Sequence, residues 1–190
     1  MRRFLVFDTE TTGLPVKGAA FDDPRQPQVV QFAAVLMQED RTPIHSIDII
    51  VRSPKEIPEA AARVHGITTE FSQKVGLFPS VVMGMWEQMA RVADMAVAHN
   101  IDYDLPIIRA IFSKYKRAWI QPPEMYCTMK QMTNFCKLPA RIGYKWPTLS
   151  EAYRHIFNKE IENAHNAMGD VSATTEIFFA LLRGEVREKI

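Results

Sequence analysis

The sequence has little cysteine, no excess of charge and no long apolar stretch, and each shortage excludes a class of protein. Only two cysteines occur among the 190 residues, Cys127 and Cys136, and neither has the neighbouring Cys or His pattern of a zinc site. We expect reduced thiols in a reducing compartment. Lys and Arg number 23 against 22 Asp and Glu, so no global positive charge holds nucleic acid, and any basic patch must be local.

We expect neither a targeting segment nor a membrane segment. The N-terminus, Met-Arg-Arg followed by a four-residue apolar run, is too short for a signal peptide. No apolar stretch approaches the length of about 20 residues that spans a membrane. The chain is 47% hydrophobic and shows no repeats or linkers, so we expect a single domain over residues 1–190 in a soluble, cytoplasmic protein.

The apolar periodicity predicts strands in the first quarter of the chain and mainly helices after it. We expect strands over residues 3–8, 29–37, 44–51 and 95–98, with a hairpin turn near residue 40. Short helical pieces occupy 54–75, and longer helices are expected over 79–92, 104–116, 127–135, 148–157 and 167–183. This order predicts an α/β fold with a mixed sheet and helices on both faces.

Two carboxylates stand at the end of the first predicted strand. Asp8 and Glu10 are two positions apart after an unbroken apolar run, and in a strand such residues point to the same side. Two negative charges held this close need a proton or a cation between them. Oxygen ligands favour Mg²⁺ or Mn²⁺, although this pair alone also fits an acidic strand end that faces water.

A second acidic segment, residues 99–104, joins a buried strand to a helix. Asp104 stands where a helix N-cap is expected, with Pro106 two residues further on. Capping is therefore a sufficient structural reason for Asp104. Asp102 is a competing candidate for any chemistry, and the residues alone leave both interpretations open.

A third acidic segment, residues 165–170, opens the last predicted helix. Asn166 can cap this helix, which places Asp170 in the first turn, where the helix dipole favours a carboxylate. His165 lies just before the helix. Gly169 is a poor helix former, and it is tolerated more easily if another group approaches the backbone closely.

These three segments, in this order, resemble the exonuclease motifs of the DEDDh family. The matching residues are Phe-Asp-Thr-Glu-Thr-Thr-Gly, Ala-His-Asn-x-x-Tyr-Asp and His-x-Ala-x-x-Asp. The resemblance spans residues 4 to about 183. That family includes bacterial proofreading subunits of the DNA polymerase III epsilon type and the three-prime repair exonucleases, and it implies a ribonuclease H-like fold.

The resemblance also implies roles for single residues. The catalytic Asp of the second motif follows an aromatic residue, which selects Asp104 over Asp102. Asp8, Glu10, Asp104 and Asp170 would hold two divalent metal ions, Mg²⁺ or Mn²⁺, and His165 would act as general base. Two such ions about 3.5–4 Å apart can clamp the attacking and leaving oxygens. The implied products are nucleoside 5′-monophosphates released from a 3′ end.

Contacts to the substrate are implied less directly. The family pattern places six residues near the terminal nucleotide: Thr11, Gly13, Leu14, His65, Ile67 and Tyr103. Leu14 and Ile67 would wedge against bases and Tyr103 would pack against the sugar, while core or loop packing explains the same residues as well. The basic-aromatic stretch 137–146 fits either a path for the strand or a solvated loop.

Three alternatives to a DNA-directed 3′–5′ exonuclease stay open. One is a family member that degrades RNA or oligoribonucleotides, because no residue in the sequence can be identified as one that recognises the 2′-OH. Another is a binding module without activity, which the presence of all four carboxylates and the His disfavours. The last is a proofreading subunit that works only with a polymerase. The expected partner is a single-stranded or frayed 3′ end of nucleic acid, with DNA favoured. The oligomeric state is open.

Overall fold

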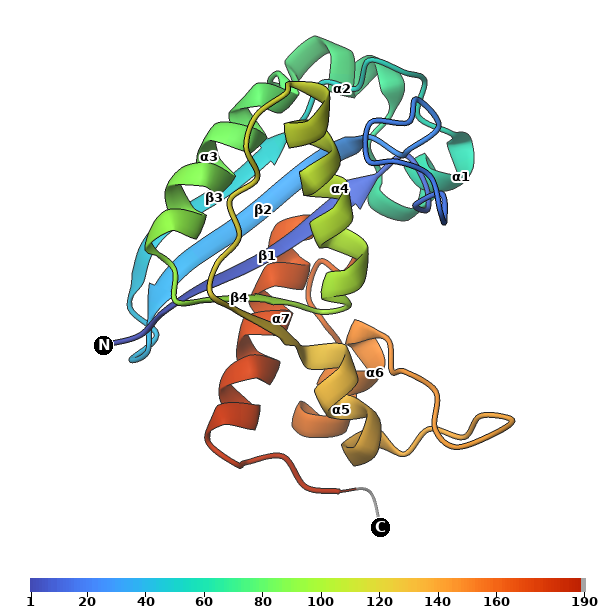
Figure 1. The fold of residues 1–190 in the computed structure, drawn as a ribbon. Coiled ribbons are helices and arrows are strands. Elements are labelled where there is room, and N and C mark those ends of the chain that lie inside the picture. Colours follow the sequence, from blue (N-terminus) through green and yellow to red (C-terminus); the bar gives the residue numbers. More distant parts are fainter. Residues whose placement is uncertain (189–190) are drawn as a thin grey trace.

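A five-stranded mixed sheet in the order β3-β2-β1-β4-β5 forms the middle of the molecule (Figure 1). β1 (Arg3–Thr11) pairs antiparallel with β2 (Val29–Gln38), and β2 pairs antiparallel with β3 (Pro43–Ile50). On its other edge β1 pairs in parallel with β4 (Met95–Ala98), which pairs in parallel with β5 (Glu124–Cys127). The central strand β1 therefore borders both the antiparallel and the parallel half.

Seven helices surround this sheet in a computed structural model that describes residues 1–188. They are α1 (Glu59–His65), α2 (Thr69–Val75), α3 (Pro79–Val92), α4 (Ile101–Lys114), α5 (Thr128–Cys136), α6 (Leu149–Phe157) and α7 (Ala167–Leu182). Within residues 1–188, none of them is long and apolar enough to cross a membrane.

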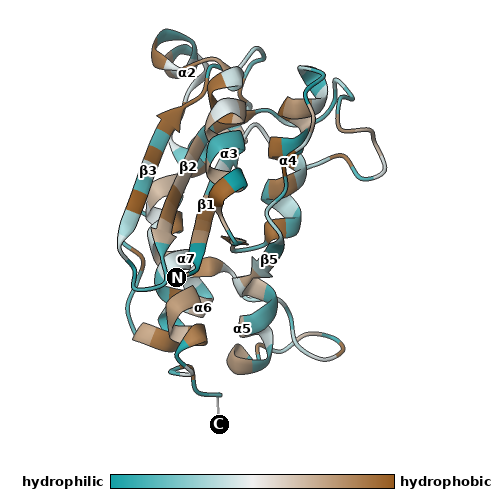
Figure 2. Cartoon of the chain, turned by 60° about the vertical axis from the view of Figure 1, so that its left-hand side comes forward, coloured by the Kyte–Doolittle hydropathy of each residue, from teal (hydrophilic) through white to brown (hydrophobic). Residues whose placement is uncertain are grey.

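Helices cover both faces of the sheet, as the sequence predicts. Side chains alternate along β1, so Leu5 and Phe7 pack on one face with Trp86 of α3. Phe4 and Val6 pack on the opposite face against α7. The brown stretches along β1 and β2 in Figure 2 are their hydrophobic residues.

The first strand is longer than predicted. β1 continues to Thr11 because β2 pairs with it as far as Thr11. Asp8, predicted as the last residue of the strand, and Glu10, predicted beyond it, therefore both lie within the strand. Their side chains fall on the same face as Phe4 and Val6, which is the face that α7 covers.

In the second motif, Asp104 is not the helix cap, contrary to the prediction from its position in the sequence. α4 begins at Ile101, with Asn100 at the N-cap position in a left-handed conformation (φ 72°). Asp104 is consequently buried in the first turn. Asn tolerates this backbone conformation better than most residues, so the chain turns from β4 into the helix earlier than the position of Pro106 indicated.

One strand was missed and several helix ends were predicted correctly. β5 has a single buried residue, Cys127, and four residues carry too little alternation to indicate a strand. The helix predicted from Cys127 begins at Thr128. The capping box of α6, formed by Thr148 and Glu151, is present with both of its hydrogen bonds.

Candidate active site

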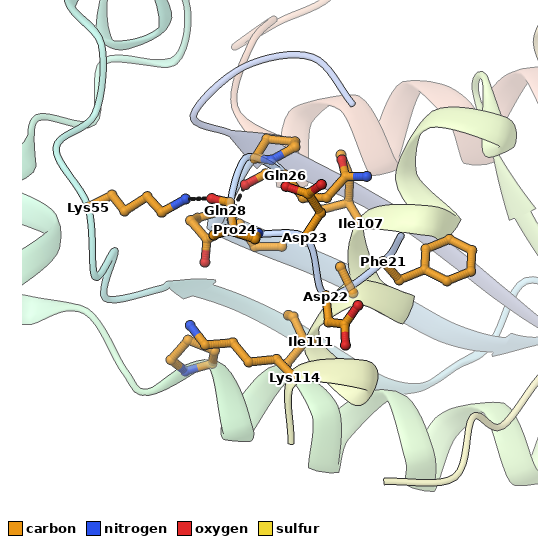
Figure 3. Close-up of a pocket in the computed structure, with 14 residues that line it drawn as sticks. Phe21, Asp22, Asp23, Pro24, Gln26, Gln28, Lys55, Ile107, Ile111 and Lys114 are labelled. Atoms are coloured by element: carbon orange, nitrogen blue, oxygen red, sulfur yellow. Dashed lines mark hydrogen bonds between the residues drawn. The ribbon is translucent and has the colours of Figure 1, made fainter. Parts of the chain in front are cut away.

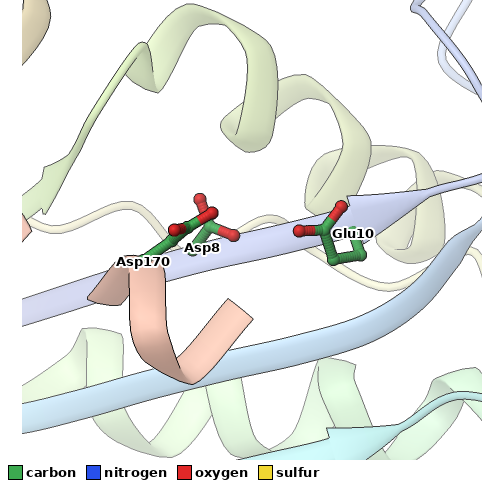
Figure 4. A group of neighbouring side chains, drawn as sticks. All are labelled: Asp8, Glu10 and Asp170. Atoms are coloured by element: carbon green, nitrogen blue, oxygen red, sulfur yellow. The ribbon is translucent and has the colours of Figure 1, made fainter. Parts of the chain in front are cut away.

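Three carboxylates meet on the α7 side of β1. Asp8 and Glu10 project from the strand, and Asp170 reaches them from the first turn of α7 (Figure 4). One carboxylate oxygen from each of the three lies within 4.8 Å of the other two. The last helix thus brings a residue from the end of the chain to the first motif, as the resemblance implies.

The fourth carboxylate reaches the same strand from α4. Asp104 Oδ1 accepts hydrogen bonds from the backbone amide of Thr9 at 3.1 Å and from the Thr9 hydroxyl at 2.6 Å. Parallel pairing between β1 and β4 is recorded from Phe4 to Val6. Asp104 therefore satisfies a strand amide beyond that paired segment, where a buried donor without a partner would be costly.

Burial raises the pKa of all four carboxyl groups, and repulsion between carboxylates adds to the effect at Asp8, Glu10 and Asp104. The pKa of Asp8 is raised well above its usual range by burial and by the neighbouring Asp104, Asp170 and Glu10. Burial, with repulsion from Asp170 and Asp104, raises the pKa of Glu10 to about 8. Such a cluster resists full ionisation unless a cation neutralises it.

The two remaining carboxyl groups have stabilising partners and smaller shifts. Burial raises the pKa of Asp104 to about 7 against the opposing hydrogen bonds from Thr9. Burial raises the pKa of Asp170 to about 6, while the charge and the backbone amide of His165 act in the opposite direction. Asp104 lies outside the group of three whose oxygens are within 4.8 Å of one another. Carboxylate oxygens such as those of Asp8, Glu10 and Asp170 match the ligand preference of Mg²⁺ and Mn²⁺.

His165 is exposed and lies directly before α7. Its backbone is left-handed (φ 64°), a conformation that is uncommon for a non-glycine residue. The loop that carries it packs against the helix at Gly169, where an added Cβ would stand 2.4 Å from the carbonyl oxygen of Asn163. A close backbone approach therefore explains Gly169, as the sequence indicated.

The start of α7 is fixed by two residues. Asn166 accepts hydrogen bonds from the amides of Met168 and Gly169 and is the predicted cap. The buried Gln31 of β2 accepts from the amide of Ala167 at 3.3 Å and donates to Asp48 of β3 at 2.7 Å. A chain of hydrogen bonds from two strands thus sets the position of the helix that carries Asp170.

The loop after the first motif is tied to the second motif. The Tyr103 hydroxyl lies 2.6 Å from the Thr11 hydroxyl and donates to the carbonyl of Gly13 at 2.9 Å. Leu14 follows with 80% of its surface exposed. Thr11, Gly13 and Tyr103 therefore form one bonded unit beside Glu10, and Leu14 projects from it.

The segment around His65 lies next to this unit. The Nδ1 atom of His65 accepts a hydrogen bond from the amide of Ile67 at 3.1 Å. The Nε2 atom of His65 is buried without a hydrogen-bond partner among the described residues. Burial lowers the pKa of His65, while the backbone of Thr11 acts in the opposite direction. Ile67 is buried with Val30, so the packing interpretation accounts for it.

Two further residues of the second motif have clear positions. Asp102 is exposed and pairs with Lys130 at 2.5 Å, so it points away from the carboxylate cluster. His99 Nδ1 lies 3.0 Å from the Thr128 hydroxyl and its Nε2 lies 3.1 Å from the carbonyl of Pro147. Sequence reasoning missed His99, Thr9 and Gln31. Thr9 and His99 had a local signal, since both lie within acidic strand-end segments, whereas Gln31 stands in an apolar strand with no acidic neighbour.

A separate pocket of about 200 Å³ lies between the 21–29 segment and α4 (Figure 3). Phe21, Pro27, Ile107 and Ile111 line it, and a hydrogen bond from Lys55 to the carbonyl of Pro24 closes one side. None of the four clustered carboxylates contributes to its lining. In the acidic cluster, Asp8, Glu10 and Asp170 are partly buried and Asp104 is buried.

A family model described as exonuclease (RNase T) matches residues 5–178 of this chain. The protein belongs to this exonuclease family. The two motif-bearing ends of the match, β1 and α7, are the elements that supply Asp8, Glu10 and Asp170. The exonuclease is therefore a nuclease hydrolase whose acidic cluster suits divalent metal ions.

Relatives and solved structures agree with this membership. DNA polymerase III subunit epsilon of Rickettsia conorii is 24% identical over 183 residues, covering 96% of this chain and 74% of that protein. An exonuclease of Escherichia phage 186 is 28% identical, covering 95% and 88% respectively. The DNA polymerase III subunit epsilon-like protein of Rhodobacter capsulatus is 30% identical, covering 94% of this chain and 23% of that protein.

The solved structures show the fold of the exonuclease. Escherichia coli exonuclease I in complex with a dT13 oligonucleotide superposes with a TM-score of 0.74 at 18% identity. The match covers 95% of this chain but only 41% of that chain. The predicted ribonuclease H-like α/β fold is thereby confirmed, with a sheet of five strands.

Proposed function

We propose that the protein is a metal-dependent 3′–5′ exonuclease that releases nucleoside 5′-monophosphates from the 3′ end of DNA. The observation that carries this proposal is the convergence of Asp8, Glu10 and Asp170 on β1, with Asp104 bonded to the same strand through Thr9. Their raised pKa values indicate a site that is completed by cations. Polymerase III epsilon relatives and DNA-bound exonuclease I support DNA as the polymer.

The four carboxylates would hold two divalent ions, Mg²⁺ or Mn²⁺. Bound there, such ions would neutralise the phosphodiester and lower the pKa of the attacking water. His165 would accept the proton of that water on a ring nitrogen, and its exposed position allows the proton to pass on to solvent. Thr9 holds the Asp104 carboxylate in place throughout.

The terminal nucleotide would lie beside the bonded unit of Thr11, Gly13 and Tyr103. Their hydroxyl and carbonyl groups are already fixed by mutual hydrogen bonds, so little ordering is needed when substrate binds. The exposed Leu14 is available to contact the last base. His65, whose ring approaches the Thr11 backbone, would complete this side of the site.

The test is a 5′-labelled single strand incubated with the purified protein and Mg²⁺ or Mn²⁺. We expect a ladder that shortens from the 3′ end, with mononucleotide products and no activity in EDTA. Equal cleavage of a strand with a blocked 3′ terminus would contradict the proposal. Matched DNA and RNA strands, single and duplex, in the same assay decide between this function and the RNA-degrading alternative.

Polymerase association is the second candidate function. The Rickettsia conorii relative is named as a subunit of DNA polymerase III, and that name is the observation in its favour. If the protein acts as a proofreading subunit, polymerase should increase its activity on a mismatched or frayed 3′ end more than on a free single strand. The same increase on both substrates would count against this role.

A further inference from the structure

The segment between α5 and α6 forms a projecting hairpin, which we call the arm and define as residues 137–147. The amide of Lys145 bonds the carbonyl of Leu138 at 3.0 Å, and the amide of Ala140 bonds the carbonyl of Gly143 at 3.3 Å. Gly143 has a φ of 67°, which suits the tight reversal. Figure 1 shows the arm in orange, extending away from α5 and α6.

Large apolar side chains on the arm are exposed to solvent. Ile142 is 90% exposed, Trp146 is 62% exposed and Tyr144 is 48% exposed. The other tryptophans are packed, since Trp86 is fully buried and stacks on Trp119 at 5.4 Å between ring centroids. Exposed aromatic rings grouped on one hairpin indicate a binding surface rather than a packing element.

The charge of the arm is of one sign. Residues 137–147 contain Lys137, Arg141 and Lys145 and no acidic residue. Lys137 pairs with Glu188 and Lys145 pairs with Glu151. Arg141 forms no ion pair within residues 1–188, so its guanidinium is available to an external anion such as a phosphate.

The base of the arm is attached to the active-site strand end. His99 follows β4 directly, and its Nε2 lies 3.1 Å from the carbonyl of Pro147. Burial lowers the pKa of His99 to about 4, so the ring stays neutral near pH 7. The same turn leads into α4, which carries Asp104. The arm therefore has a fixed relation to the carboxylates.

We propose that the arm binds the single-stranded part of the substrate upstream of the nucleotide that is being removed. Tyr144 and Trp146 stack on bases, and Arg141 contacts a phosphate. Stacking on an aromatic ring tolerates any base, which an enzyme that moves along a strand requires. The position upstream of the removed nucleotide rests on the proposed function, but strand binding by the arm can be measured without catalysis.

A protein partner is the competing occupant of the arm. Aromatic and aliphatic side chains would suit that role as well, but a run of eleven residues with three basic side chains and no carboxylate matches a polyanion. The binding test separates the two, because a surface for protein leaves the fluorescence of Trp146 unchanged when an oligonucleotide is added.

The experiment follows tryptophan fluorescence while oligo-dT is added in EDTA, which prevents metal-dependent cleavage. We expect quenching in the wild type that is lost in Trp146→Phe, because Trp86 is buried in the core and Trp119 is partly buried against it. Tyr144→Ala combined with Trp146→Phe should raise the Kd, followed by anisotropy of a labelled strand, by roughly tenfold. Tyr115→Ala, an exposed ring at the end of α4, should bind as the wild type does.

Salt dependence tests the phosphate contact. For Arg141→Gln we expect the slope of log affinity against log salt to become shallower by about 0.7, the value for one contact with a single strand. Arg117→Gln, an exposed arginine paired with Glu87, is the matched control and should leave the slope unchanged.

Kinetics connect the arm to turnover. The Tyr144→Ala, Trp146→Phe variant should have a raised KM for a long single strand and an unchanged KM for a dinucleotide, which is too short to reach the arm. Quenching without cleavage would contradict the proposed exonuclease function but support strand binding by the arm. Cleavage without quenching, or quenching that persists in Trp146→Phe, would contradict strand binding by the arm.

Discussion

The Thr9 hydroxyl donates a 2.6 Å hydrogen bond to the buried carboxylate of Asp104, and the Thr9 amide donates a second one. This pair joins the C-terminal end of β1 to the first turn of α4, 95 residues further along the chain. These bonds hold Asp104 beside Asp8, and they involve neither the Asp8 nor the Glu10 carboxylate. Thr9, placed between Asp8 and Glu10, thus holds the second motif against the first.

Replacing Thr9 should separate the contribution of its hydroxyl to stability and activity from that of its backbone amide. Thr9→Val keeps the shape but removes one donor from a buried carboxylate, which costs about 1–3 kcal/mol. We expect a lower midpoint of urea unfolding and a lower kcat. Thr9→Ser keeps the hydroxyl and should retain most of both; an equal loss in Thr9→Ser and Thr9→Val would show that the methyl group matters as much as the hydroxyl.

Asp102 and Asp104 offer a paired test of the site assignment. Asp104→Asn should nearly abolish cleavage, because an amide cannot supply the negative charge that a metal ion requires. Asp102→Asn removes only an exposed ion pair with Lys130, which contributes at most about 1 kcal/mol. Single-turnover rates at saturating Mg²⁺ decide between them, and a reversed ranking would exclude Asp104 as the functional residue.

Gly169 should be intolerant of a side chain. In Gly169→Ala the new Cβ would meet the Asn163 carbonyl at 2.4 Å, so the loop with His165 must move. We expect a loss of about 1–3 kcal/mol in stability and a marked fall in kcat. Gly84→Ala in α3 meets nothing within 4 Å and should stabilise the helix by about 1 kcal/mol, with activity unchanged.

Without metal, stability should fall as the pH rises from about 4 to about 8. Burial raises the pKa of Glu10 to about 8 and that of Asp104 to about 7, whereas unfolded carboxyls titrate near pH 4. The folded state therefore keeps protons that the unfolded chain has lost. This stabilisation is complete below the unfolded pKa and disappears as the pH passes the folded pKa.

Calorimetry in EDTA across this range measures the effect. Glu10→Gln should make the decline in Tm shallower, while Glu39→Gln, in the exposed turn after β2, should leave it unchanged. Adding Mg²⁺ should raise the Tm at pH 8 and have little effect at pH 4, where the carboxyls hold protons. A Mg²⁺ effect of the same size at both values would disprove the acidic site as the point of binding.

Gln31 and Asp48 should act as a unit that positions α7. Gln31→Glu places a second carboxylate beside Asp48, and we expect kcat to fall with little change in KM, because Asp170 and His165 move together. Adding Asp48→Asn lets the amide donate to the new carboxylate, which can still accept from the Ala167 amide. We expect kcat to be higher in the double variant than in Gln31→Glu. Asp48→Asn alone should not raise kcat above that of the wild type.

The sequence by itself determined the local features. Unbroken apolar runs marked β1 and β4, the spacing of Thr148 and Glu151 specified a helix start, and Asn166 before Asp170 specified another. These features depend on residues within four positions of one another. The three acidic motifs and their order are of the same kind, and the family match confirms the family that they indicate.

Only the tertiary structure decided how the motifs meet. The continuation of β1 past Asp8 depends on pairing with β2, and the burial of Asp104 depends on Thr9 across the chain. The contact of Gln31 with Ala167 spans 136 residues. Such contacts follow from the packing of helices on the sheet, which no local pattern encodes, and they set the distances on which the chemistry of the site depends.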